Sequence, residues 1–173
     1  MKKRNIYTMA ELQLALQSAF NAANRDLFGG ELQKVVITAK EGQRKHAYGW
    51  ITLQKGWIQG KVERHEINIS SEYLTRPVVD VMCTLVHEMC HLWNIQHGIQ
   101  DCSRAGVYHN KAFRDCAEKH LLLVEHCAHI GYGRTSPSSA FAAWVHDNKG
   151  LTMKGICDII DLAAIQEGGI INE

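Results

Sequence analysis

The chain has 173 residues, of which 46% are hydrophobic and 21% charged, and its 19 basic and 18 acidic side chains give a net charge of +1. This composition is typical of one globular domain that is long enough to bury a core. Two prolines and 14 glycines exclude collagen-like and proline-rich disordered classes, and no apolar run approaches the roughly 20 residues of a membrane span. We therefore expect no membrane association. The near-zero charge gives no general attraction for nucleic acid, whereas ten histidines and six cysteines stand out.

The six cysteines do not include a Cys-x-x-Cys pair, the spacing typical of zinc ribbons and thioredoxin-like sites. A disulfide framework is typical of short secreted chains. The basic start at Met1–Arg4 resembles a signal peptide, but Asn5, Tyr7 and Glu11 interrupt the apolar stretch that should follow. We expect a cytoplasmic protein with reduced thiols, whose cysteines pack as small apolar side chains.

The first third of the chain predicts one helix followed by short strands. Thr8 with Glu11 three residues later forms a capping-box pattern, and apolar residues at helical spacing continue to Phe28. The pair Gly29–Gly30 is expected to end this helix. Short stretches rich in β-branched and aromatic residues then predict a small sheet of three or four strands, at residues 35–38, 47–53, 57–58 and 65–70.

The next segments predict two long helices and an extension. A nearly all-apolar helix is expected from Val78 to about Trp93, and such a helix belongs in the core. A loop over 94–108 leads to a second long helix from Asn110 to about His129. Residues 131–139 resemble a linker, and an apolar pattern over 156–163 predicts a further helix. The fold class is therefore α+β, with a main domain over residues 1–130 and a linker and short helical extension over 131–173.

The buried helix contains the sequence His87-Glu88-Met89-Cys90-His91. Residues four apart lie on the same helix face, so the two imidazoles can hold one zinc ion while Glu88 reaches the same side. A catalytic zinc takes three protein ligands and leaves a fourth position for water. The motif therefore predicts a zinc hydrolase in which Glu88 is the general base.

Two residues compete to be the third ligand. His97 lies six residues after His91, which reproduces the compact metzincin spacing with Asn94 in place of glycine. Metzincins also have a methionine turn below the metal, and the only downstream methionine, Met153, lies beyond the predicted linker. The alternative is His109, just before the second long helix, where a ligand can fold back over the first.

The motif and its surroundings resemble the SprT-like metallopeptidases, the group that includes Spartan, over about residues 8–130. In that family the third ligand begins a His-x-x-x-Phe segment, and His109 to Phe113 has this form. Similar segments precede the motif, at residues 27–32, 48–50 and 66–69. The resemblance implies a zincin-like fold, zinc ligands His87, His91 and His109, and Glu88 as the catalytic residue. The chain departs from the family at Asn110, where glycine is usual, and in lacking the zinc ribbon that often follows.

The function expected from these features is a zinc metalloendopeptidase acting on protein substrates. The resemblance implies substrates that are bound or crosslinked to DNA. A local basic patch for DNA is suggested by three groups of residues: Lys2–Arg4, Arg44–His46, and Lys55 with Lys61 and Arg64. Two alternatives stay open: a DNA-associated binding module that keeps zinc with little turnover, and a His-Glu-x-x-His protease that cleaves a regulatory protein. An extended substrate is expected to add to the sheet edge at Tyr48–Ile51.

Overall fold

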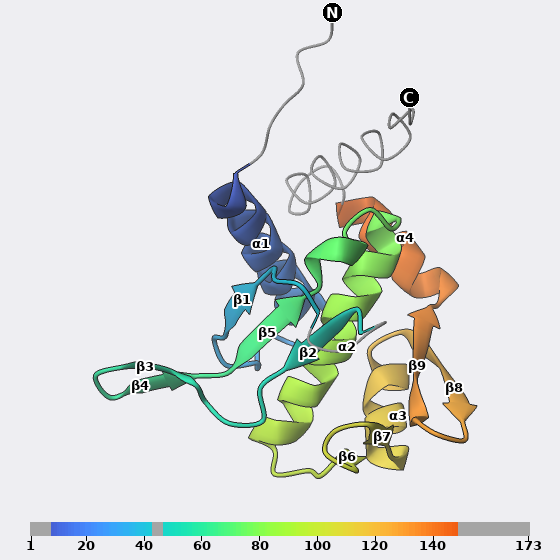
Figure 1. Cartoon of the computed structure of the whole chain (residues 1–173). Helices are drawn as coiled ribbons and strands as arrows, with labels where there is room; N and C mark the ends of the chain where they lie inside the picture. Colours follow the sequence, from blue (N-terminus) through green and yellow to red (C-terminus); the bar gives the residue numbers. More distant parts are fainter. Residues whose placement is uncertain (1–7, 43–46, 149–173) are drawn as a thin grey trace, which may run out of the picture.

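A computed structural model of the chain describes residues 8–42 and 47–148. The described part is a mixed α/β structure, compatible with the expected α+β class, in which helices pack on small sheets (Figure 1). In chain order its elements are α1 (Met9–Leu27), β1 (Val36–Thr38), β2 (Gly49–Ile51), β3 (Trp57–Gln59), β4 (Val62–Arg64), β5 (Glu66–Ile69), η1 (Ser71–Tyr73), α2 (Val78–Gln96), β6 (Cys102–Ser103), β7 (Tyr108–His109), α3 (Lys111–Lys119), β8 (Leu122–Cys127), β9 (Gly131–Pro137) and α4 (Ser139–Asn148).

Helix α1 confirms the predicted N-terminal helix and its cap. The Glu11 backbone N–H donates to Thr8 Oγ1 at 3.2 Å, and the Thr8 backbone N–H donates to Glu11 Oε2 at 2.6 Å. One face of the helix is buried, including Leu16 and Phe20. Burial of each of these side chains stabilises the fold by about 1.5–3 kcal/mol. The helix ends before Gly29, whose φ of +64° is the left-handed conformation that glycine tolerates.

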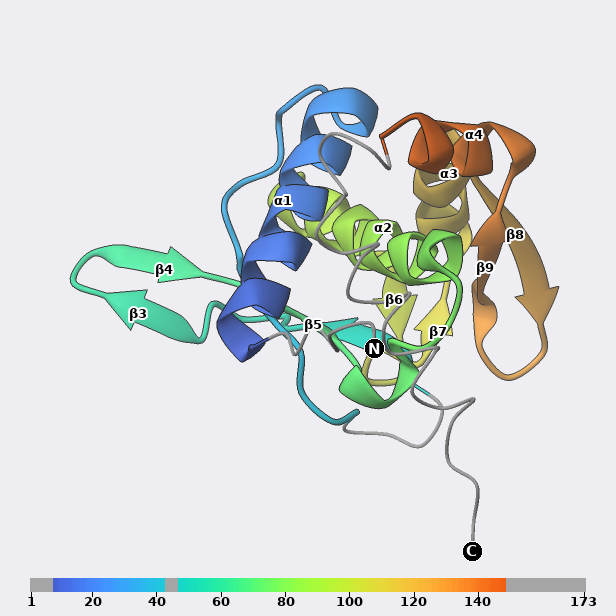
Figure 2. The same ribbon diagram turned by 90° about the horizontal axis from the view of Figure 1, so that it is seen from above.

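The first sheet has three strands, in agreement with the predicted three or four, and their order is β1–β5–β2. Strand β5 is the central strand, parallel to β1 and antiparallel to β2, and it is buried along its whole length. Strand β2 is therefore an edge strand. The strand predicted at residues 57–58 belongs instead to a separate hairpin, β3–β4, which projects from the body of the molecule (Figures 1 and 2).

Helix α2 passes through the centre of the structure and contacts α1, α3, α4 and three strands (Figure 2). Its side chains contribute the largest part of the apolar core, with Val81, Met82, Leu85, Val86, Met89 and Leu92 all 0% exposed. The predicted buried helix is confirmed. It begins at Val78, as expected, and continues about one turn beyond the expected end, to Gln96. None of the helices in the described ranges is long and apolar enough to cross a bilayer.

The second long helix predicted for residues 110–129 is wrong. Helix α3 ends at Lys119, and Leu121 adopts a φ of +69°, which redirects the chain. Strand β8 follows, with Leu122 buried and Leu123 exposed, an alternation with the period of a strand. The residues predicted to form one long helix therefore divide between a short helix and a strand.

The predicted linker at 131–139 is also wrong. Residues Gly131–Pro137 form β9, which pairs with β8 along most of its length and with β7 at Gly131. The result is a second sheet in the order β6–β7–β9–β8. Helix α4 then packs Phe141 and Val145 into the core. The helix predicted over 156–163 lies outside the described residues, and the division at residue 130 and the zincin-like arrangement stay predictions.

Candidate metal centre

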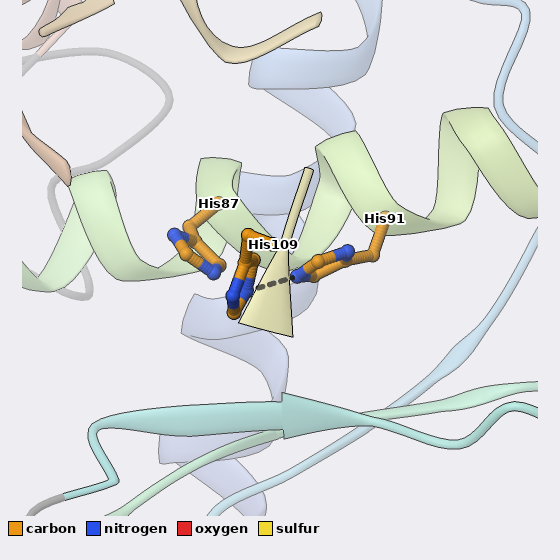
Figure 3. A group of neighbouring side chains, drawn as sticks. All are labelled: His87, His91 and His109. Atoms are coloured by element: carbon orange, nitrogen blue, oxygen red, sulfur yellow. Dashed lines mark hydrogen bonds between the residues drawn. The ribbon is translucent and has the colours of Figure 1, made fainter. Parts of the chain in front are cut away.

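Two elements bring the candidate metal ligands together. Helix α2 carries His87 and His91 one turn apart, and the short strand β7 carries His109. The three imidazoles converge from these two elements (Figure 3). Each has one nitrogen within 4.8 Å of the corresponding nitrogens of the other two. The Nε2 atoms of His91 and His109 are 3.1 Å apart.

The rings form a tight cluster on one aromatic support. Their centroids are 5.0 Å apart for His87 and His91, 5.2 Å for His87 and His109, and 4.9 Å for His91 and His109. The fully buried Phe113 lies at 4.5 Å from the centroids of His87 and His91 and at 4.6 Å from that of His109. The first turn of α3 therefore restricts all three rings.

The outer nitrogens of two rings are already hydrogen-bonded. His87 Nδ1 lies 3.0 Å from Thr135 Oγ1 on β9, and His91 Nδ1 lies 2.7 Å from Asp101 Oδ2. The Nδ1 atom of His109 is buried and has no hydrogen bond of good geometry within the described part of the chain. With Nδ1 occupied, Nε2 of His87 and of His91 is the nitrogen available to a metal, which is the pattern of metal-ligating histidines. Three imidazole nitrogens also match a known ligand set of catalytic zinc.

Burial and mutual proximity control the protonation of the rings. Burial lowers the pKa of His87 well below its usual 6.5, and nearby His91 and His109 add to this effect. Burial, together with His91, also lowers the pKa of His109, to about 4. Burial acts in the same direction on His91, but the hydrogen bonds that its ring makes with Asp101 and Cys102 outweigh burial and raise the pKa of His91 to about 10. A cation held by these rings would compete with the proton on His91, so its binding would release that proton.

Glu88 lies beside the histidines and is only 6% exposed. Burial raises the pKa of its carboxyl to about 7, an effect that His91 opposes and Asp101 reinforces. The edge strand β2 approaches this residue closely because position 49 is glycine. A Cβ atom there would lie 3.4 Å from Glu88 Cγ, 3.0 Å from Thr84 Cγ2 and 2.9 Å from the Asn68 carbonyl oxygen.

A cleft of about 1210 Å³ opens over the three histidines and Glu88. One face of α2 lines it, through residues at helical spacing from Asp80 to Ile95. Strand β2 borders one side, and the loop around residues 101–107 together with β9 contributes further walls. The cleft therefore gives an extended ligand access to the imidazole cluster along the edge of the first sheet.

The competing candidate, His97, lies away from this cluster. Its side chain is exposed beyond the end of α2, its Nδ1 donates to the Trp93 carbonyl oxygen at 2.7 Å, and its ring stacks on Trp93 with centroids 4.2 Å apart. The structure therefore joins His109, and not His97, to His87 and His91.

Comparison with known proteins gives one match that accounts for this arrangement. The model of the SprT-like family matches residues 16–126, which is more than half of the chain and includes the three histidines and Glu88. The chain belongs to the SprT-like family. This family is associated with metal-dependent, metallopeptidase-like domains. No curated protein and no solved structure matches the chain.

The SprT-like domain contains a second cluster of potential metal ligands, formed by Cys90, Cys116 and His120. All three are buried, and their polar groups have partners without a metal. The Cys116 thiol donates to the Cys90 carbonyl oxygen at 3.7 Å, and His120 Nδ1 donates to the Cys116 carbonyl oxygen at 2.7 Å. The His120 ring also stacks on Phe28 at 3.9 Å. This cluster fits the packing role that the sequence predicts for the cysteines.

Two residues around the histidines were missed by the sequence analysis of this SprT-like chain. Asp101 is in the loop predicted over 94–108, and Thr135 is in the segment interpreted as a linker. Their distance from the motif along the sequence does not predict these contacts, because tertiary folding brings each residue to its histidine. The one available signal was a carboxylate, Asp101, within an otherwise uncharged stretch between Asn94 and Ser103.

Proposed function

We propose that this SprT-like protein is a zinc-dependent metallopeptidase that hydrolyses peptide bonds in protein substrates. The observation that carries the proposal is the meeting of three imidazoles and the buried carboxyl of Glu88 in one cleft, beside an edge strand. A purely structural zinc site has no need of a carboxyl group at that position, because four protein ligands already fill the coordination of the metal.

In this proposal His87, His91 and His109 hold the zinc ion. The orientation of the His87 and His91 rings, with Nδ1 bonded outward to Thr135 and Asp101, supports the assignment. When bound, zinc supplies a Lewis acid that polarises the scissile carbonyl and lowers the pKa of water toward neutrality. Phe113 packs against all three rings and restricts their orientation.

Glu88 is the proposed general base. Its carboxylate accepts the proton of the attacking water and then delivers that proton to the amine of the departing peptide fragment. The position is suitable because Glu88 adjoins His87 in sequence and lines the same cleft as all three histidines. The close approach of β2 at Gly49 brings the edge strand next to this carboxylate.

The substrate is proposed to bind in an extended conformation along β2. In the described part of the chain, β2 pairs only with β5, so its other edge faces the cleft with backbone groups available for pairing. Backbone pairing is insensitive to side-chain identity, so side chains lining the cleft are expected to give the selectivity. The family resemblance supports proteins bound or crosslinked to DNA as the substrate class.

The experiment is a comparison of the full-length protein with Glu88→Gln, a nearly isosteric change that removes the base. We expect Glu88→Gln to bind zinc as the unmodified protein does and to cleave an unfolded protein substrate about 10²–10⁴-fold more slowly. Glu118→Gln, a change at an exposed carboxyl on α3, is the matched control and should retain full activity. Full cleavage activity in Glu88→Gln would refute the proposed mechanism.

A further inference from the structure

Asp101 occupies an unusual position for a carboxylate in a loop. It lies between α2 and β6, yet it is only 7% exposed. Carboxylates are rarely buried unless other groups pair with them, so its partners indicate what it does.

The side chain of Asp101 joins two residues of α2. Its Oδ2 atom accepts from His91 Nδ1 at 2.7 Å and from Asn94 Nδ2 at 3.0 Å. Asn94 lies three residues after His91 on the same helix face and is only 2% exposed. The amide of Asn94 therefore holds the carboxylate in place, and the carboxylate in turn holds the His91 ring with Nε2 directed toward the other imidazoles.

The backbone around Asp101 reaches a second histidine of the cluster. The carbonyl oxygen of Asp101 accepts from the Asn110 backbone N–H at 2.9 Å, and the Asn110 side-chain amide donates to the Gln100 carbonyl oxygen at 2.8 Å. The next residue, Cys102, pairs with His109 across the β6–β7 ladder. The same short segment therefore fixes the strand that carries His109.

We propose that Asp101 is a positioning residue for the zinc site, through its carboxylate on His91 and through its backbone on the strand of His109. The inference rests on the proposed function, in which these histidines bind zinc. In this proposal Asp101 acts through His91, whose Nδ1 it contacts, and it is not one of the three zinc ligands. Its carboxylate selects the tautomer with the proton on Nδ1 of His91 and makes Nε2 a stronger donor to a metal.

The test measures zinc affinity by competition with a chelator, independently of peptide cleavage. Asp101→Asn keeps the shape of the side chain and removes its charge, whereas Asp101→Ala removes both hydrogen bonds. We expect zinc affinity to fall about 10–100-fold in Asp101→Ala and by less in Asp101→Asn. Asp115→Asn, an exposed carboxyl on α3, is the matched control and should leave the affinity unchanged.

A second measurement distinguishes positioning of His91 from a general contribution of Asp101 to stability. Each protein is loaded with Co²⁺, and its visible absorption bands report the geometry at the metal. We expect a shifted Co²⁺ spectrum in Asp101→Asn, a change that a loss of overall stability alone would not produce. Unchanged zinc affinity, or reduced affinity with an unaltered Co²⁺ spectrum, would overturn the role of Asp101. If the unmodified protein itself bound no zinc, the proposed function would fail, which is a different outcome from failure of this inference.

Discussion

At the scale of single residues, the imidazole cluster depends on neighbours that have no ligand chemistry of their own. Strand β9 passes directly against His109 because it carries glycines at two positions. A Cβ atom at Gly131 would lie 2.1 Å from the His109 carbonyl oxygen, and one at Gly133 would lie 2.6 Å from His109 Nδ1. Both distances are shorter than the 3.0 Å that real Cβ contacts keep, so a side chain at either position forces His109 or β9 to shift.

This close packing predicts the effect of Gly133→Ala. The added methyl group should push the His109 ring out of the cluster, weaken zinc binding about 10-fold or more, and destabilise the fold by about 1–3 kcal/mol. Gly56→Ala is the matched control, because nothing lies within 4 Å of a Cβ atom at that position. Chelator competition and thermal unfolding measure both effects. Wild-type zinc affinity in Gly133→Ala would show that the ring of His109 is not a ligand.

A second residue-scale prediction concerns Glu66 on β5. Burial raises the pKa of its carboxyl, but hydrogen bonds from Lys40, Thr38 and Trp57 outweigh burial and hold this pKa below its ordinary 4.5. A carboxyl with a lowered folded-state pKa stabilises the protein above its unfolded-state pKa. That contribution is lost as the pH falls below 4.5 and through the folded-state pKa.

We therefore expect Glu66→Gln to lower the free energy of unfolding by about 1–3 kcal/mol at pH 7. The difference from the unmodified protein should shrink as the pH falls below 4.5, because Glu66 becomes neutral in both the folded and the unfolded chain. Denaturant unfolding at a series of pH values measures this, with exposed Glu63→Gln as the control. A difference that stays constant across the pH range would contradict the assigned role of Glu66.

The sequence identified the residues whose spacing is fixed by one helix and missed those that the fold brings in. His87, Glu88 and His91 follow from the helical repeat, so their proximity could be predicted directly. The choice between His97 and His109 needed the family resemblance, because spacing alone favoured neither. Asp101 and Thr135 meet the histidines only through tertiary contacts, which no local pattern encodes.

At the scale of elements, the sequence predicted helices correctly where the apolar residues have a helical period and capping residues mark the ends. It failed where the same apolar residues fit both a helix and a strand. Helices α1 and α2 have long apolar faces and clear ends, and both were found. Residues 113–124 contain apolar side chains that fit a helical stripe, but Leu121 in the left-handed region separates α3 from β8. The two glycines, the serine and the proline of β9 resemble a linker, yet the glycines permit close packing on His109 and the strand pairs with β8.

Helix α4 packs Phe141 and Val145 into the core from the segment that was predicted to be a linker and extension. Its Phe141 side chain is 0% exposed, so Phe141→Ala should lower the free energy of unfolding by about 3–5 kcal/mol. The control is Leu123→Ala on β8, where the side chain is 56% exposed and the change should cost about 0.5 kcal/mol or less. Denaturant unfolding compares the two variants. Equal small effects would mean that α4 does not pack on the core.

At the scale of the whole molecule, the net charge of +1 leaves any affinity for DNA to a local group of cations. Within the described ranges, Lys55, Lys61 and Arg64 lie on or beside the projecting β3–β4 hairpin, while Lys2–Arg4 and Arg44–His46 lie outside those ranges. The hairpin also exposes Trp57 and Ile58. A basic and aromatic surface of this kind is suited to nucleic acid.

We propose that DNA associates with this hairpin, and the proposal predicts a specific salt dependence. Each phosphate contact contributes a slope of about −0.9 to the plot of log affinity against log salt concentration for duplex DNA. Replacing Lys55 and Lys61 by alanine should therefore reduce the magnitude of the slope by about 1.8. Lys119→Ala on α3 is the control. If the double replacement left the slope unchanged, the hairpin would not be the site of DNA binding.

The central claim is that His87, His91 and His109 together hold one zinc ion. Its most direct test is the zinc content of the purified full-length protein and of its His109→Ala and His97→Ala variants, measured by elemental analysis. We predict one equivalent of zinc in the unmodified protein and in His97→Ala, and a large loss of zinc in His109→Ala. Zinc retained in His109→Ala and lost in His97→Ala would contradict the ligand set and the site built on it.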